Sequence, residues 1–283
     1  MKRVRLLVKN AARYPGSFLV RLLCGAAALA VAGTLVLIIG YILITGIPNL
    51  KPSLFALEYN SENVSLLPAL FNTVIMTLLS LLLAVPLGVG GAIYLAEYAN
   101  RSSRIVKAVR LTAETLAGIP SILYGLFGMM FFVTSLRWSY SLLAGGMTLA
   151  VMILPLILRT TEEALLSVPD SYREGSFGLG AGRLRTVTHI VLPPAMSGIL
   201  AGVILAIGRV VGETAALIYT AGTVADWPKG VMSSGRTLAV HMYVLSGEGL
   251  HVSEASATAV VLLVIVVGMN ALSAFAAKKL TRG

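Results

Sequence analysis

The feature that most constrains this 283-residue chain is a series of apolar runs, each long enough to cross a membrane. A transmembrane helix needs about 20 predominantly apolar residues. Six runs approach or exceed this length, at residues 22–47, 67–94, 111–136, 141–158, 194–222 and 255–277. Charged residues make up 12% of the chain, against about a quarter in soluble domains. The sequence therefore predicts an all-α membrane protein with six transmembrane helices.

The chain begins with a basic segment, residues 1–21, ahead of the first apolar run. A secretory signal peptide also begins with positive charge, but its apolar core is only about 7–15 residues long. The run at residues 22–47 is longer than such a core. We therefore interpret it as a retained helix, which gives a basic N-terminal segment (1–21) followed by a single six-helix transmembrane domain (22–283).

Lys and Arg are distributed unevenly over the predicted loops. Six crossings place both termini and the second and fourth loops on one side, where 17 of the 22 Lys and Arg residues fall. The opposite side has four, and Arg209 lies inside the fifth apolar run. Because basic loops remain in the cytoplasm, both termini are predicted to be cytoplasmic. This topology explains the net charge of +10, so no nucleic-acid partner is expected.

Several kinds of catalytic and cofactor site are missing from the sequence. It has no Gly-Lys dipeptide, which excludes a Walker A phosphate loop, and no Gly-x-Ser, which excludes a nucleophile elbow. The single cysteine, Cys24, excludes an intramolecular disulfide. His189, His241 and His251 lack the spacing of metal ligands, and we expect His241 and His251 to be solvated loop residues. The prediction is a non-catalytic chain that binds no metal or cofactor of its own.

The longest weakly apolar segment lies between the fourth and fifth apolar runs. Its residues 168–193 are called the docking loop below. The positions that stand out in it are Glu174, Gly175, Ser176, Gly180, Ile190, Leu192 and Pro193. Glycine and serine beside Glu174 leave little side chain, so another surface could approach the backbone closely. Pro193 and Pro194 suit a bend into the next helix. A solvated inter-helix loop would explain the polarity. It would not explain the spacing of Gly180, Ile190, Leu192 and Pro193, which follow Glu174 by 6, 16, 18 and 19 residues.

Three charged residues fall within or beside apolar runs. Glu114 lies near the cytoplasmic end of the third run, where it could cap the helix or pair with a nearby arginine, and a structural role is the favoured interpretation. Arg209 and Glu213 lie inside the fifth run, and a charge at mid-bilayer costs about 2.5–3.5 kcal/mol on insertion scales. At i, i+4 they would share one helical face and could pair. They are either a pair that locks helix packing or part of a substrate pathway, since a guanidinium matches the oxygens of a tetrahedral oxyanion.

The spacing from Glu174 to Pro193 resembles the EAA loop of ABC-importer permeases. Four further stretches resemble the A-type (PstA-like) permease subunit of phosphate-specific ABC importers: GGAIYLAEYA (90–99), LAGIPSILYGLFG (116–128), TEEALLSVPDSYRE (161–174) and GRVVGETAAL (208–217). The family's usual Glu-Ala-Ala is Glu-Gly-Ser here, and Gly208 stands where alanine is commoner. Both changes keep the side chains small.

The resemblance implies the type I ABC importer permease fold in a bacterial inner membrane, with the docking loop as a short cytoplasmic coupling helix. It implies three partners: a paralogous permease subunit (PstC-like), a cytoplasmic ATPase dimer (PstB-like) that uses ATP and Mg, and a periplasmic phosphate-binding protein (PstS-like). Inorganic phosphate is the expected substrate, because of the resemblance. The alternatives are a permease for molybdate or sulfate and, from another class, half of an ion-coupled secondary transporter or a channel. Residues 221–254, the longest predicted outward segment, are the candidate contact for the binding protein.

Overall fold

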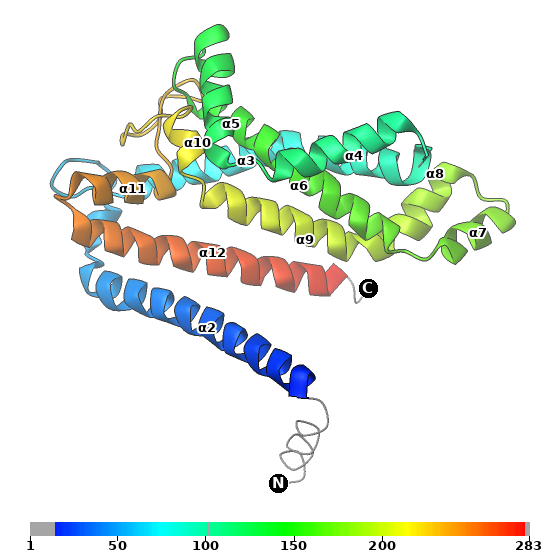
Figure 1. Cartoon of the computed structure of the whole chain (residues 1–283). Coiled ribbons are helices and arrows are strands. Elements are labelled where there is room, and N and C mark those ends of the chain that lie inside the picture. The colour runs from blue at the N-terminus through cyan, green and yellow to red at the C-terminus, as the bar shows by residue number, and fades with distance from the viewer. Residues whose placement is uncertain (1–14, 101, 281–283) are drawn as a thin grey trace.

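The described part of the chain, residues 15–100 and 102–280 of a computed structural model, consists of helices and loops, and no strand occurs in it (Figure 1). The long helices are α2 (Pro15–Gly46), α3 (Leu67–Ile93), α4 (Arg104–Ala117), α6 (Leu142–Leu166), α9 (Leu192–Val211) and α12 (Val252–Leu280). The short elements are η1 (Ile47–Asn49), η2 (Pro52–Phe55), η3 (Tyr94–Tyr98), α5 (Ser121–Gly128), η4 (Met129–Ser135), α7 (Asp170–Gly178), α8 (Arg183–Thr186), η5 (Val187–Val191), α10 (Ala215–Ile218) and α11 (Leu238–Glu248). Three of the short elements, η3, η4 and η5, are π-helical turns.

Five of the six predicted crossings are continuous helical segments that are long and apolar enough to span a membrane: 16–49, 67–98, 142–166, 183–211 and 252–271. The third predicted helix, at residues 111–136, is not continuous. It is split into α4 and the α5–η4 segment, which meet at an angle of 101°. The break follows from Pro120, which lacks a backbone N–H and disfavours the helical conformation at the residue before it.

Packing at both ends of the bundle shows that the broken segment still crosses it once. Asn72 near the start of α3 and Leu142 at the start of α6 both lie against Gly235. Ala96, just beyond α3, and Leu165, near the end of α6, share an apolar cluster at the other end. Helices α3 and α6 therefore run in the same direction, and the chain between them must return across the bundle. Six crossings result, as predicted.

The bundle has two distinct ends, with α7 and α8 at one of them (Figure 1). We call this the docking-loop end and the opposite one the far end. Helix α2 reaches the far end at Gly46, which lies against Val260 of α12. With six crossings, both described ends of the chain lie at the docking-loop end. Most of the predicted basic segment 1–21 falls outside the described residues.

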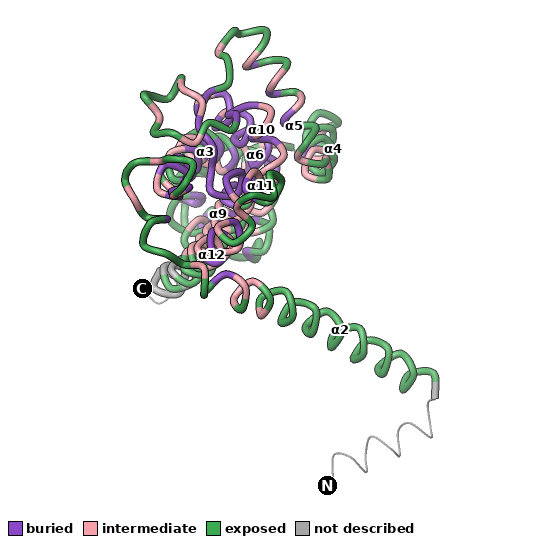
Figure 2. Tube along the Cα trace, turned by 90° about the vertical axis from the view of Figure 1, so that its left-hand side faces the viewer, coloured by how far each residue is buried: buried purple, intermediate pink, exposed green. Residues whose placement is uncertain are grey.

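The centre of the bundle is packed around α3, α6 and α9. Its largest cluster of buried side chains includes Met76, Leu149, Ile153, Ile157 and Val210. Lipid is as apolar as these side chains, so helices associate in a membrane through close van der Waals packing. In contrast, the apolar window of α2 is entirely exposed, and Figure 2 shows this helix standing away from the others. Such a surface suits contact with lipid or with another transmembrane subunit.

The segment at the far end, residues 223–254, is not a simple polar loop. It contains α11, whose side chain His241 is fully buried and packs edge-on against Tyr59, with ring centroids 6.4 Å apart. Our expectation of a solvated His241 is therefore wrong. Burial, and then the positive charge of Arg236, lowers the pKa of His241 to about 3. The imidazole is neutral at physiological pH as a result.

Candidate functional site

The docking loop folds as two helical pieces joined by a glycine turn. Helix α7 begins after Pro169 and ends at Gly178, which confirms the predicted short helix between the fourth and fifth crossings. The turn contains Gly180 with a φ of +83°, a conformation that is rarely accessible to other residues. The positive φ therefore explains why residue 180 is a glycine, in addition to the space that a glycine leaves for an approaching surface. After this turn, α8 and η5 continue directly into α9.

The two adjacent prolines at the junction of the docking loop and the fifth crossing do not produce the expected bend. Pro193 and Pro194 lie in the first turn of α9, and residues 183–211 form one helical run. The π-helical turn η5 comes just before them, and the Leu192 N–H donates to Val187 O, five residues back. Proline is tolerated in the first turn of a helix because the N–H groups there lack helical partners. The second half of the docking loop is therefore an extension of the fifth crossing.

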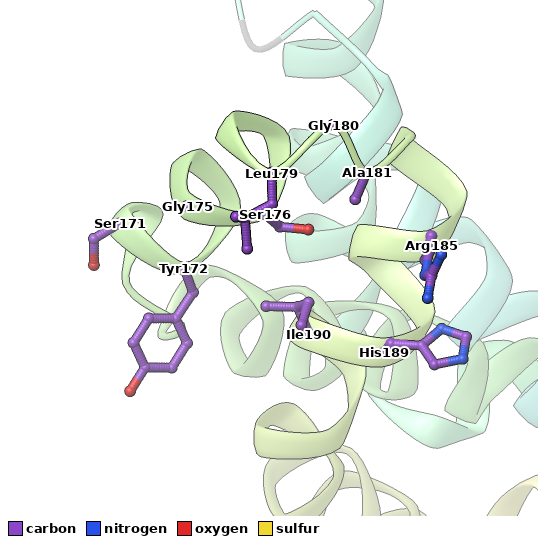
Figure 3. A pocket seen from close by; sticks show the side chains of 10 residues that line it. All are labelled: Ser171, Tyr172, Gly175, Ser176, Leu179, Gly180, Ala181, Arg185, His189 and Ile190. Atoms are coloured by element: carbon purple, nitrogen blue, oxygen red, sulfur yellow. The ribbon is translucent and has the colours of Figure 1, made fainter.

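A pocket of about 520 Å³ lies between α7 and the α8–η5 segment (Figure 3). It is lined by Ser171, Tyr172, Gly175, Ser176, Leu179, Gly180, Ala181, Arg185, His189 and Ile190. Ser176 also joins α7 to α8 through a hydrogen bond, with its Oγ 2.8 Å from Thr186 Oγ1. The structure thus brings together Gly175, Ser176, Gly180 and Ile190 of the predicted set. It leaves Glu174 exposed outside the pocket, and it places Leu192 and Pro193 beyond the pocket at the start of α9.

Sequence reasoning missed the apolar side chains around this pocket. Leu179 is 92% exposed and Tyr172 is also exposed, and both line the pocket, with the exposed Phe177 nearby in the sequence of α7. Single exposed apolar residues are common, but a group around one depression is typical of a protein contact. The sequence did contain a sign of this surface, because Tyr172, Phe177 and Leu179 are large apolar residues within an otherwise polar loop.

Helix α7 is fastened to the bundle by Arg173. This guanidinium donates to Glu97 Oε1 at 2.6 Å and to Asp170 Oδ1 at 3.1 Å. It also donates to the carbonyl oxygens of Val168 at 2.7 Å and Leu165 at 2.8 Å. The hydrogen bond to Glu97 raises the pKa of Arg173 above its ordinary value, so this residue stays charged at any physiological pH.

The predicted face shared by Arg209 and Glu213 is absent. Helix α9 ends at Val211 with Gly212 as its C-cap, so Glu213 lies beyond the helix. Its Oε1 accepts a hydrogen bond from the Ala216 N–H at 3.1 Å, at the start of α10. Among the described residues no ion pair joins Arg209 and Glu213. The i, i+4 argument failed because it assumed a continuous helix through Gly212, a residue that favours helix ends.

Arg209 is half-buried in the last turn of α9. The exposed residues Ala201 and Leu205 lie on α9 eight and four residues before Arg209, so Arg209 belongs to the exposed side of the helix. Helix α9 packs on α6 and α12, and the charge of Arg209 also acts on the buried Tyr124 of α5, so the guanidinium lies at the edge of the chain's own core. A cation here is available to whatever covers that side.

Charged residues between α4 and α6 form a second group near the docking-loop end. The guanidinium of Arg159 lies 3.5 Å from Glu114 and 2.9 Å from Glu163, so of the two structural roles expected of Glu114 the structure shows the pairing with an arginine. Arg110 and Glu162 are 2.6 Å apart, with Glu162 largely buried. Within the residues that the structure describes, no group of three or more His, Cys, Asp or Glu side chains could hold a metal ion.

Comparison with known proteins links this architecture to one family. Residues 88–282 match the model of the binding-protein-dependent transport system inner membrane component family. The probable ABC transporter permease protein YqgI of Bacillus subtilis (strain 168) is 34% identical over 241 residues, which cover 80% of this chain and 82% of that protein.

Two relatives carry the name of a phosphate transport system permease protein. PstA of Pasteurella multocida (strain Pm70) is 40% identical over 62% of this chain and 63% of its own length. PstA 1 of Mycobacterium tuberculosis (strain ATCC 25618 / H37Rv) is 40% identical over 54% of this chain and 49% of its own length. The alignments thus span less than two thirds of either PstA relative, and the chain is PstA-like within them.

Solved structures show the same fold at low sequence identity. A chain of a bacterial alginate ABC transporter, in complex with an alginate pentasaccharide-bound periplasmic protein, superposes with a TM-score of 0.68 at 15% identity, covering 96% of this chain and 97% of that one. A chain of the MetNI methionine ABC transporter gives a TM-score of 0.59 at 18% identity, covering 86% and 98%. These likenesses support the type I ABC importer permease fold. The family match covers most of the sequence, and the protein therefore belongs to the binding-protein-dependent transport system inner membrane components, the multi-pass permease subunits of ABC importers.

Proposed function

We propose that this chain is the A-type permease subunit of an ABC importer that carries inorganic phosphate into the cytoplasm. The observation that carries the transport role is α7, a short helix at one end of a six-crossing bundle, with small and exposed apolar residues around a pocket. The PstA relatives, at 40% identity, support phosphate as the substrate. Molybdate or sulfate remains the alternative within the same class.

The surface of α7 supports the proposal that an ATPase docks there. Gly175 is exposed and has open space where a Cβ would stand, so a partner could reach the helix backbone there. Leu179 and Tyr172 offer apolar area beside it. A PstB-like ATPase dimer would supply the ATP and Mg chemistry. This assignment places the docking-loop end, and with it both termini, in the cytoplasm.

The other two partners would cover surfaces that this chain leaves open. A PstC-like permease subunit would complete the pathway against the exposed side of α9 and could cover α2. A PstS-like phosphate-binding protein would contact the far end, where residues 223–234 are mostly exposed and α11 packs beneath them. The alginate transporter, solved with its periplasmic protein, supports this kind of partner.

The phosphate pathway would use Arg209 without an ion pair to Glu213. Arg209 lies at the C-terminal end of α9, where the helix dipole is negative. That partial charge would weaken the attraction of the guanidinium for a bound anion, and conduction requires binding weak enough for release. Glu213 would act indirectly, because its bond to Ala216 shapes the turn that follows Arg209.

Uptake of labelled phosphate tests the proposed substrate. Cells that contain the chain, with its ATPase and binding protein, should accumulate phosphate in an ATP-dependent manner, and cells without it should lose that uptake. Excess molybdate or sulfate should not compete. Competition by either anion at low concentration would contradict phosphate and support the alternative. Uptake driven by an ion gradient without ATP would contradict the ABC assignment.

Arg209→Gln tests the pathway within the same assay. It should abolish phosphate uptake while the complex still assembles and binds its ATPase, because the glutamine removes the charge but keeps a polar, hydrogen-bonding side chain. Normal uptake by this variant would show that Arg209 has only a packing role.

A further inference from the structure

The turn η3, at the end of the GGAIYLAEYA stretch, has a role in the structure that docking alone does not explain. It continues α3 as five π-helical residues, and π-helical turns occur frequently at functional sites. Three arginines from three different elements contact it, namely Arg110 of α4, Arg173 of α7 and Arg183 of α8. Both helical pieces of the docking loop are therefore joined to one turn of α3.

The contact between Arg173 and Glu97 is the strongest of the three. The guanidinium meets the carboxylate through two nitrogens, with Nη2 2.6 Å from Oε1 and Nε 3.2 Å from Oε2. The two side chains are only 10% and 7% exposed. Exposed ion pairs exchange partners with water and contribute little, whereas a buried, bidentate pair holds a fixed geometry. Helix α7 and η3 are thus linked by a contact that resists separation.

The other two contacts are weaker and more exposed. Arg183 lies over the Tyr98 ring at 5.6 Å from its centroid, and both residues are exposed. Arg110 donates to the Leu95 carbonyl at 3.4 Å, near the limit of a hydrogen bond. They position the neighbouring helices around η3, but neither has the burial or the charge pairing of Arg173 and Glu97.

The face of α7 that contacts η3 and the face that is open to a docked protein lie on opposite sides of the helix. Arg173 and Gly175 are two residues apart, which places them about 200° apart around the helix axis. Arg173 is buried against η3, whereas Gly175 is exposed beside the pocket. One face of α7 is therefore available to a docked protein while the opposite face is bound to the end of α3.

The two halves of the docking loop are connected to the bundle in different ways. The second half continues covalently into α9, because residues 183–211 form one helical run. The first half, α7, has no such continuity with α3 and reaches it through side chains. Any displacement of α7 would pass to α9 along the helix itself, and to α3 through Arg173 and Glu97 as well as through α6, which precedes α7 in the chain and packs on α3.

We propose that Glu97 and Arg173 are positioning residues that transmit movement of the docked ATPase from α7 to α3, so that α3 and α9 move together during transport. This inference rests on the proposed function. It adds to docking a second requirement, a rigid connection on the face of α7 that the ATPase does not touch.

Glu97→Gln is the most direct test, because it removes the charge of the pair but leaves the bonds of Arg173 to Leu165 and Val168. The importer, reconstituted in vesicles with its ATPase and binding protein, should assemble normally and hydrolyse ATP. Phosphate moved per ATP hydrolysed should fall at least tenfold. Glu97→Asp, which keeps the charge, should recover part of this ratio. Glu163→Gln, which removes an exposed ion pair of the same bundle end, should leave the ratio unchanged.

A merely structural role predicts a different result. Assembly, hydrolysis and uptake would then fall in proportion, with the ratio unchanged, and this would overturn the proposal. If Glu97→Gln reduces the amount of protein in the membrane, Glu97→Leu with Arg173→Met provides the second test, because apolar replacement of a buried ion pair is often well tolerated. Normal coupling in that double variant would also overturn the proposal. Failure of the proposed function is distinct, since the wild-type chain would then not copurify with an ATPase at all.

Discussion

The two ends of the bundle each bury an arginine, but they satisfy it in opposite ways. At the docking-loop end, Arg173 pairs with the carboxylate of Glu97 and donates to two backbone carbonyls. At the far end, Arg236 is 4% exposed, donates to Tyr59 Oη at 3.0 Å and lies 5.2 Å from the centroid of that ring. No acidic side chain pairs with it among the described residues, and its Nε lacks a hydrogen-bond partner.

This difference suits the two ends to different functions. A buried charge pair is rigid and directional, which is what a mechanical connection to an ATPase requires. The far end instead contains buried polar atoms without partners, including Asn72 Oδ1 and both ring nitrogens of His241. Unsatisfied polar groups reduce stability. The far end contains more such groups than the docking-loop end, where Thr161 Oγ1 is the atom of this kind among the described residues.

The largest expected contrast between the ends is their accessibility from outside the cell. In a Cys24→Ala background, Ser171→Cys at the docking-loop end should resist an impermeant thiol reagent in intact cells, whereas Ser253→Cys at the far end should react. Both serines are exposed in the structure, so burial does not explain the difference. After permeabilisation both should react. The reverse pattern in intact cells would place the docking loop outside and contradict the cytoplasmic assignment.

The next largest contrast concerns the buried arginines themselves. Arg173→Met should lower stability by about 3–5 kcal/mol, because it leaves the buried Glu97 carboxylate unpaired. Arg236→Met should cost less than about 2 kcal/mol, since only a neutral hydrogen bond and a cation–π contact are lost. Thermal unfolding of the two variants in detergent measures the difference. Equal destabilisation would show that charge pairing does not distinguish the ends.

A smaller contrast appears when the pH is lowered. The pKa of His241 is about 3 in the folded protein and about 6.5 in an unfolded chain, so the unfolded state binds more protons between these values. Stability from this residue is complete above pH 6.5 and is lost as pH falls toward 3, by about 2 kcal/mol at pH 5. The difference in unfolding midpoint between pH 7.5 and pH 5 should shrink in His241→Phe. An unchanged difference would mean that other groups cause the acid sensitivity.

The fold could be predicted from the sequence where the evidence was local composition. The six apolar runs gave six crossings, and the polar residues between the fourth and fifth gave α7. The prediction of one continuous third helix was wrong, because Pro120 breaks the helix without changing the overall hydropathy of the run. The buried His241 was missed because α11 is short and the histidine packs against Tyr59, which is distant in sequence.

The candidate site was predictable where small residues had a local reason. Gly175 and Gly180 were identified because glycine leaves space, and the structure adds the positive φ of Gly180. The pairing of Arg209 with Glu213 failed because spacing on a helix has meaning only while the helix continues, and it ends at Gly212. The link between Glu97 and Arg173 could not be found from spacing at all, since 76 residues separate the two partners.

The central claim is that an ATPase docks on the exposed face of α7, and a size series at Gly175 tests it most directly. This glycine has a helical backbone and open space around its Cβ position, so substitutions do not strain the chain itself. Gly180→Trp would be a less clean test because of the positive φ there. ATP-driven phosphate uptake in vesicles should be near normal for Gly175→Ala and lost for Gly175→Trp, with equal amounts of both chains in the membrane. Wild-type uptake by Gly175→Trp would contradict docking at α7.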